Sequence, residues 1–272
     1  MCGIAGIFSE KSIHAAEIQR MGDVLAHRGP DGQGFMLSKG VQAENPLPGL
    51  IEFSPALPCH VALAHRRLAI VDLSPLGHQP MVWQQRYAIT FNGEIYNHIE
   101  LRQELEALGY AFTSHSDTEV ILAAYNAWGV QCLNKFNGMW AFVLVDTQQH
   151  KVLIARDRFG IKPLYYAQNH GTFVFASEIK VLLEHPAVDA VPDLDFAKQY
   201  LCSGPSEEGE QTAWQGILRF PAASYIECEI TQLITSPLAP VQYWDVQPNL
   251  STEAFDDFKA QQLADGYYHL LE

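Results

Sequence analysis

Short apolar runs joined by tight turns are the feature that most restricts how this chain folds. Met139–Asp146 and Lys151–Arg156 flank the polar stretch Thr-Gln-Gln-His, and Leu164–Ala167 and Thr172–Ala176 flank a turn that contains Asn-His-Gly. Runs of this length with so few residues between them predict β-hairpins, which build antiparallel sheets. Further strands are predicted at Ile4–Phe8, Val61–Ala64, Leu68–Leu73, Tyr87–Phe91 and Ser224–Ile230.

Helices are predicted between these strands by apolar periodicity and by residues that start or stop a helix. Ser12 is a candidate cap for a helix that ends at Arg28–Pro30, and Gly109 stops a helix over about Glu100–Leu108. Ser116–Glu119 has the S-x-x-E capping-box form and opens the next helix. Helices packed outside antiparallel sheets give an α+β layered fold. No G-x-G-x-x-G or G-x-x-x-x-G-K-[ST] loop occurs, so a doubly wound nucleotide-binding fold is not expected.

The charge of the chain excludes some classes of partner. Its 272 residues contain 31 Asp and Glu against 17 Lys and Arg, a net charge of −14. Nucleic acid and anionic membranes would be repelled, so neither is expected as a partner. The longest fully apolar run, Met139–Val145, is too short to span a membrane, and the N-terminus lacks the basic region of a signal peptide. A cytoplasmic protein is therefore expected.

The five cysteines include no C-x-x-C pair, so a zinc site or a disulfide framework is not indicated. Cys2 differs from the other four because it directly follows Met1. Methionine aminopeptidases generally remove Met before a small residue, so the mature chain is expected to begin with Cys2. A thiol and a free α-amine then share one residue, and an amine with a pKa of about 7.7–8.0 can act as general base for the thiol. Many chains begin Met-Cys by chance, so the weight of this signal depends on the surrounding motifs.

Eight motifs follow one another along the chain. They are Met1–Phe8, Arg28–Gly32, His65–Ser74, Gly77–Met81, Phe91–Asn97, Ser116–Leu122, Gly138–Phe142 and Ala155–Tyr166. Together they closely resemble the N-terminal glutaminase domain of glutamine-hydrolysing asparagine synthetases, which are class II, N-terminal-nucleophile (Ntn) amidotransferases. Several motifs in one order are far more specific than any one of them.

The resemblance implies a four-layer αββα Ntn-hydrolase sandwich, in which helices flank two antiparallel sheets. It places a glutaminase domain at residues 2–245, and it makes residues 246–272 a linker and the truncated first helix of a missing synthetase domain. The pyrophosphate loop S-G-G-x-D-S of that domain does not occur in the sequence. ATP and Mg²⁺ are expected only in the missing domain, and no cofactor or metal is expected in this chain. The uncovered apolar face of the final helix is assigned to Phe255, Phe258 and Tyr267.

The implied reaction is hydrolysis of the side-chain amide of L-glutamine to glutamate and ammonia. Cys2 would be the nucleophile, and the resemblance assigns the oxyanion hole to Asn92 and Gly93. Such a hole needs donors aimed at the developing negative charge, and a side-chain amide with a nearby backbone N–H meets that need. Without its flanking residues, Asn-Gly would be interpreted as a hairpin turn after the strand Tyr87–Phe91.

Glutamine also carries an α-carboxylate and an α-ammonium, and the resemblance assigns residues to both. Arg67 would bind the carboxylate with its planar fork, and Asp117, ranked above Glu94, would lie near the ammonium. An acid in the first turn of a helix is also favoured by the helix dipole, so Asp117 has a compatible structural interpretation. The adjoining pocket wall is assigned to Leu68, Ile70 and Val71.

Other charged and proline-rich segments are given structural interpretations. Arg66 would point away from Arg67 on an extended segment, so it is predicted to be a solvated charge. Arg156–Arg158 and Lys162 are predicted to form a scaffold ion-pair network. The proline-rich stretch Glu44–His60 is predicted to be an inserted surface loop.

Three functions are compatible with these residues. The leading hypothesis is a glutaminase whose ammonia passes to a synthetase domain or chain. The first alternative is a non-catalytic glutamine-binding or assembly module that retains the Ntn fold, since the ammonia acceptor is missing. The second is an amidase for another amide, which the pairing of Arg67 with Asp117 disfavours because these residues recognise an amino-acid head group. Self-association of the chain is left open.

Overall fold

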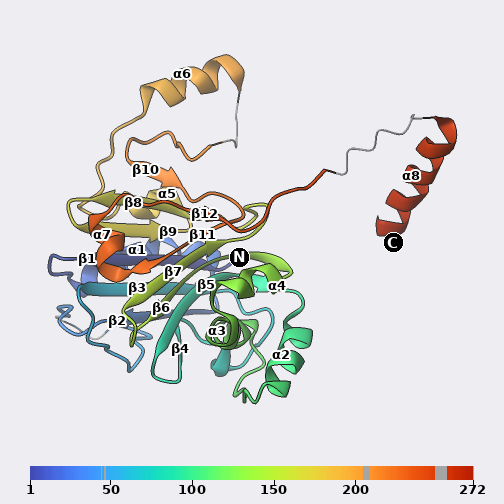
Figure 1. The fold of residues 1–272 in the computed structure, drawn as a ribbon. Coiled ribbons are helices and arrows are strands. Elements are labelled where there is room, and N and C mark those ends of the chain that lie inside the picture. Colours follow the sequence, from blue (N-terminus) through green and yellow to red (C-terminus); the bar gives the residue numbers. More distant parts are fainter. Residues whose placement is uncertain (44, 46, 205–208, 249–255, 272) are drawn as a thin grey trace.

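The computed structural model describes residues 1–43, 45, 47–204, 209–248 and 256–271. Two six-stranded antiparallel sheets stack face to face, and helices lie on their outer faces (Figure 1). The first sheet contains, in the order β10-β8-β9-β1-β3-β2, Ile217–Arg219, Tyr165–Asn169, Thr172–Ala176, Gly3–Ser9, His60–Arg67 and Gly32–Leu37. The second contains, in the order β12-β11-β7-β6-β5-β4, Val241–Gln242, Ser224–Glu229, Lys151–Arg156, Gly138–Asp146, Tyr87–Ile95 and Met81–Trp83.

The helices complete four layers. Helices α1 (Ala15–Val24) and α5 (Ile179–Leu182) pack on the first sheet, while α3 (Asp117–Trp128) packs on the second and α2 (His98–Ala107) and α4 (Cys132–Lys135) pack against α3. Helix α7 (Ile230–Thr235) contacts strands of both sheets. Helices α6 (Leu194–Ser203) and α8 (Asp257–Leu271) contain no buried residue among those described. The expected αββα sandwich is confirmed.

Strand β1 shows how the sequence produces these layers. All seven of its residues are buried, because the strand is central in its sheet and covered on both faces. Ile4 and Phe8 point into the apolar layer between the sheets, whereas Ala5 and Ile7 point into the layer under α1. This alternation places odd and even positions on opposite faces. It carries Cys2, just before the strand, to one end of the space between the sheets.

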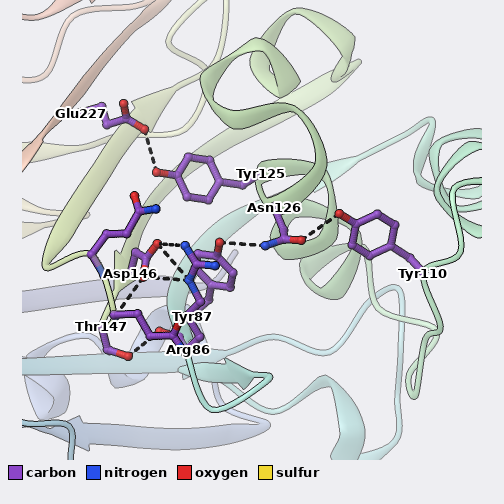
Figure 2. A network of polar contacts seen from close by, with 10 residues as sticks. Arg86, Tyr87, Tyr110, Tyr125, Asn126, Asp146, Thr147 and Glu227 are labelled. Carbon is purple, nitrogen blue, oxygen red and sulfur yellow. Dashed lines mark hydrogen bonds and ion pairs between the residues drawn. The ribbon is translucent and has the colours of Figure 1, made fainter.

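Helix α3 is tied to the second sheet by polar contacts near its C-terminal end (Figure 2). The Tyr125 hydroxyl donates to Glu227 Oε1 on β11 at 2.7 Å. Asn126 donates through Nδ2 to the Tyr87 hydroxyl at 2.9 Å and accepts from the Tyr110 hydroxyl at 2.8 Å. These bonds fix the rotation of α3 about its axis. Its first turn, at the opposite end, therefore meets β5 in a defined orientation.

The structure departs from two short-range signals in the sequence. Asn92 and Gly93 lie inside β5, which continues to Ile95 and pairs with β6, so they do not form a turn. Residues 68–73 form a loop after β3 rather than a strand. That loop is held by the Arg67 side chain, which donates to the carbonyls of Asp72 and Ser74.

The predicted stop at Gly109 and the predicted cap at Ser116 are confirmed, the latter by a bond from the Thr118 N–H to Ser116 Oγ, whereas the predicted bounds of the first helix are wrong. Gly109 and Gly129 follow α2 and α3 with φ of +93° and +57°, a conformation that glycine adopts readily. Helix α1 begins at Ala15 rather than after Ser12, and Glu17 Oε1 accepts the His14 N–H at 3.1 Å. The predicted start of the last helix at Ser251 lies outside the described residues. No helix in the described ranges is long and apolar enough to cross a membrane.

Candidate active site

The residues predicted for the site come together in one pocket. It lies at the end of the space between the sheets, where β1, β3 and β5 meet the first turn of α3. All nine predicted residues line it, namely Cys2, Arg67, Leu68, Ile70, Val71, Asn92, Gly93, Glu94 and Asp117. They come from four separate segments of the chain, so the fold creates their proximity.

Cys2 is held at the start of β1 by contacts on both its side chain and its backbone. Its Sγ accepts a hydrogen bond from the Leu68 N–H at 3.3 Å and lies 3.5 Å from the Leu68 carbonyl oxygen. Its carbonyl oxygen accepts from Arg28 Nε at 2.8 Å. Burial raises the pKa of the Cys2 thiol, and the Leu68 hydrogen bond, the N-terminal amine and Arg67 act in the opposite direction.

Asn92 offers an unpaired donor at the pocket. Its side chain is 1% exposed, and its Nδ2 has no hydrogen-bond partner among the described residues. A buried polar group without a partner costs free energy, so such groups in folded proteins commonly serve a ligand or a reaction. The β5 alternation directs Asn92 to the same side as Thr90 and Ala88, into the space between the sheets.

Gly93 has a packing reason to be glycine. A Cβ at this position would lie 2.3 Å from the Met139 carbonyl oxygen and 2.7 Å from Trp140 Cα on the paired strand β6. A side chain there would push β5 and β6 apart. The close approach that glycine allows at this position is therefore to the neighbouring strand, which was not foreseen from the sequence.

Arg67 lies at the end of β3 with its guanidinium held by the following loop. Nη1 donates to the Ser74 carbonyl at 3.0 Å and Nη2 donates to the Asp72 carbonyl. Gly77 permits this arrangement, because a Cβ there would lie 2.3 Å from Nη2. A guanidinium has five N–H donors, so others are left for an anionic ligand. Ile70 on the same loop is 52% exposed at the mouth of the pocket.

Asp117 is the first residue of α3 and is buried. Its Oδ2 accepts the Ile95 N–H at 3.0 Å, which joins the helix to the end of β5. Burial raises the pKa of Asp117, against the lowering effects of the Ile95 hydrogen bond and His98. One carboxylate oxygen therefore serves the scaffold, and the residue also lines the pocket where the substrate ammonium is predicted. Glu94 is half-buried on β5 nearby.

Several pocket residues were given no role from the sequence. They include Asp72, Gln79 and Thr118, while Lys162, predicted as a scaffold residue, also lines the pocket. Gln79 accepts the Phe91 N–H at 2.7 Å and donates to Thr118 Oγ1 at 3.2 Å, so it joins β5 to α3 beside Asn92. The signal that could have found it is the Gly77–Met81 motif, which was recognised without a role.

Asp72 stabilises the loop after β3. Burial would raise the pKa of its carboxyl, but hydrogen bonds from Ser74 and His115 and the nearby Arg67 outweigh burial and hold the pKa below its usual value. The carboxylate accepts the Ser74 N–H at 2.8 Å and the His115 N–H at 3.0 Å. It therefore joins the Arg67 loop to the segment that precedes α3.

The charged scaffold residues differ from prediction in their partners. Arg66 is not a solvated charge, because it donates to the Gly22 carbonyl and pairs with Asp23 on α1. Arg156 donates to three backbone carbonyls, and the Asp157 carboxylate accepts backbone N–H groups from residues 140, 159, 161 and 162. These hydrogen bonds to the main chain shape the loop after β7.

Comparison with known families agrees with this geometry. The sequence model of the glutamine amidotransferase domain matches residues 1–45 and 55–244. The chain belongs to the glutamine amidotransferase domain family. The gap in that match lies within the stretch 44–60, which was predicted to be an insertion.

Curated relatives of this amidotransferase domain are longer proteins. The chain is 35% identical to asparagine synthetase [glutamine-hydrolyzing] 3 of Bacillus subtilis strain 168, over 94% of this chain and 39% of the relative. It is 38% identical to asparagine synthetase B [glutamine-hydrolyzing] of Escherichia coli K12, over 67% of this chain and 30% of the relative. The chain therefore spans well under half the length of these relatives.

One solved structure supports the fold. The glutamine phosphoribosylpyrophosphate amidotransferase of B. subtilis superimposes with a TM-score of 0.51 and 22% identity, over 66% of this chain and 43% of that one. At this identity the similarity concerns the architecture alone.

Proposed function

We propose that this chain hydrolyses the side-chain amide of glutamine, with Cys2 as nucleophile, and that the ammonia serves an ATP-dependent, amide-forming domain of the asparagine-synthetase type. The observation that carries the proposal is the single pocket lined by a thiol, an unpaired buried amide, a guanidinium and a carboxylate. The thiol and the amide suit acyl transfer. The guanidinium and the carboxylate suit the head group of an amino acid.

The reaction requires removal of Met1, which frees the α-amine of Cys2. The amine takes the thiol proton, and the sulfur attacks the amide carbon of glutamine. Negative charge then develops on the amide oxygen, where Asn92 Nδ2 and the Gly93 N–H are the proposed donors. The α-amine then passes this proton to the amide nitrogen of glutamine, which leaves as ammonia. Water then attacks the thioester, and glutamate leaves as the thiol is regenerated.

Recognition of the amino-acid head group is assigned to the opposite part of the pocket. Arg67 binds the α-carboxylate through the N–H groups it does not donate to its own loop. Asp117, with Glu94 beside it, binds the α-ammonium. Leu68, Ile70 and Val71 form the wall between these charges.

Residues 2–245 are proposed to be the glutaminase unit, and residues 246–272 to lead toward the ammonia acceptor. Phe258 and Tyr267 on α8 are 77% and 63% exposed, which fits a helix that packs on another domain; Phe255 lies outside the described residues. ATP and Mg²⁺ would bind in the acceptor, which we place with this chain in the cytoplasm.

The test is glutamate release from glutamine, measured with the intact mass of the same preparation. Loss of Met1 with turnover that disappears in Cys2→Ala would support the proposal. A correctly processed and folded chain that binds glutamine without turnover would refute it and favour the non-catalytic module. Equal cleavage of amides that lack an α-amino acid would instead favour a general amidase.

A further inference from the structure

A charged cluster behind the nucleophile has no role in the reaction described above. Glu178, which follows β9, accepts at Oε1 from Arg28 Nη1 and His27 Nε2, both at 2.9 Å. Its Oε2 pairs with Lys180 Nζ at 3.0 Å. Burial would raise the pKa of Glu178, but the bonds from Arg28, Lys180 and His27 lower it to about 2. The carboxylate is therefore ionised at neutral pH.

Arg28 connects this carboxylate to the nucleophile. Its Nη1 bonds to Glu178, and its Nε donates to the Cys2 carbonyl oxygen at 2.8 Å. The Arg28 side chain is only 9% exposed. A planar guanidinium cannot bend between its two bonds, so the position of Glu178 fixes the direction of the bond to Cys2.

Ser177, the residue before Glu178, bonds to the backbone of Ile4 near the start of β1. The Ser177 Oγ accepts the Ile4 N–H at 3.0 Å, and the Ser177 N–H donates to the Ile4 carbonyl at 2.9 Å. Residues 177 and 178 thus hold β1 directly and through Arg28, immediately beside Cys2. The segment lies more than 170 positions away in sequence, and it directly follows β9, a sheet neighbour of β1.

We propose that Glu178 is a positioning residue for Cys2, acting through Arg28. The inference rests on the proposed role of Cys2 as nucleophile. Removal of the Glu178 charge releases one edge of the guanidinium, and it leaves a buried cation next to the first residue of the mature chain. Both effects misplace Cys2 relative to the pocket. Arg67 and Asp117, which are assigned to the substrate head group, do not contact Glu178 in any hydrogen bond or ion pair found here.

The charges near the two reacting groups define the expected electrostatic effect. His27 places Nδ1 3.0 Å from the Val24 carbonyl oxygen and Nε2 2.9 Å from Glu178 Oε1. Without the Glu178 charge, the cations of Arg28 and Lys180 lose the carboxylate that they share beside β1. Arg67 and Asp117 are the charged side chains that act on the Cys2 thiol itself. Loss of the Glu178 carboxylate adds to these influences: with one negative charge fewer nearby, the thiolate of Cys2 is favoured and should form at a lower pH.

The experiment uses the chain with Met1 removed, confirmed by intact mass. Cys2 alkylation by iodoacetamide is followed against pH, and glutamine hydrolysis is measured on the same samples. In Glu178→Gln we expect the pH midpoint of alkylation to fall by roughly half a unit to one unit, from the loss of one nearby charge. We expect kcat to fall about tenfold or more while KM changes less than about threefold, as for an interaction that affects the reacting group rather than binding. Lys180→Ala, which removes the ion pair to the other oxygen, is the matched control and should retain wild-type values.

A double-mutant cycle tests whether the effect passes through Arg28. If it does, Glu178→Gln adds little to the loss already caused by Arg28→Gln. Additive losses would overturn the inference, as would a Glu178→Gln chain with an unchanged alkylation profile and unchanged kcat. Alkylation of Cys2 does not require glutamine turnover. A wild-type chain that fails to hydrolyse glutamine therefore refutes the proposed function, while the alkylation profiles still decide the role of Glu178.

Discussion

His65 should make the stability of this protein strongly dependent on pH. The residue lies on β3 between the sheets and is 1% exposed. The Thr90 hydroxyl donates to the Ala64 carbonyl at 3.2 Å, so the His65 Nδ1, 3.3 Å from that hydroxyl, must be the donor to it. Nε2 then carries the lone pair, and it has no hydrogen-bond partner among the described residues. Protonation would place an unpaired charge in the core.

The size of this loss of stability follows from the difference in the pKa of His65 between the folded and the unfolded chain. Burial, followed by the nearby His78 and Arg67, lowers the pKa of His65 to about 3. An unfolded chain has a histidine pKa of about 6.5 and binds the proton more readily, so stability falls as the pH drops below that value. Each unit of pH is worth about 1.36 kcal/mol, and pH 5 lies about 1.5 units below 6.5. The free energy of unfolding at pH 5 is therefore expected to be about 2 kcal/mol lower on account of His65 alone.

The assay is urea unfolding followed by tryptophan fluorescence at pH 7.5 and pH 5. Wild type is compared with His65→Gln, which cannot take up the proton, and with His115→Gln at an exposed position. Wild type and His115→Gln should each lose about 2 kcal/mol more between the two pH values than His65→Gln. Contributions from His78 and His185, whose pKa values burial also lowers, cancel in this comparison. An equal pH dependence in wild type and His65→Gln would refute the reasoning.

Three further substitutions test the packing and the site. Asn92→Ala should lower kcat for glutamine hydrolysis by about 10²–10³ with little change in unfolding, as expected for loss of an oxyanion donor; a near-normal kcat would remove Asn92 from that role. Arg67→Ala should raise the KM for glutamine by at least about tenfold, and an unchanged KM would show that the carboxylate binds elsewhere. Gly6→Ala should destabilise the fold by about 3 kcal/mol in the same urea assay, because its Cβ would lie 2.3 Å from the Phe175 ring, and a wild-type midpoint would contradict this packing.

The parts of the fold that were predicted correctly are those with signals contained in a short segment. The β6–β7 and β8–β9 hairpins have both strands and the turn within about twenty residues, and the structure pairs them as expected. Asn92-Gly93 carries an equally strong local signal for a turn. It was overridden because β5 gains a full ladder of contacts with β6 that begins more than forty residues later. Local patterns do not reveal such a partner.

The site residues likewise fall into those that a local motif identifies and those that only the fold identifies. Cys2, Arg67, Asn92 and Asp117 were identified because each stands in a recognisable motif, and the structure then brought them together. Glu178 was not identified, because its partner Arg28 lies 150 positions away and nothing near either residue in the sequence indicates the contact. Residues that position other residues are recognised by contacts between distant segments, and these contacts become visible only in the folded structure.

The central position of β1 has a consequence for the order of events during synthesis. Strand β1 is synthesised long before its neighbour β9, Thr172–Ala176, and the Ile4 N–H bonds to Ser177, 173 positions later. At about 5–20 residues per second, the first strand waits roughly 10–30 s for that partner. Until then β1 can pair only with β3, so the edge of β1 next to Met1 that β9 will cover is still open when an aminopeptidase acts. By the time β9 closes the sheet, Cys2 would already be the first residue.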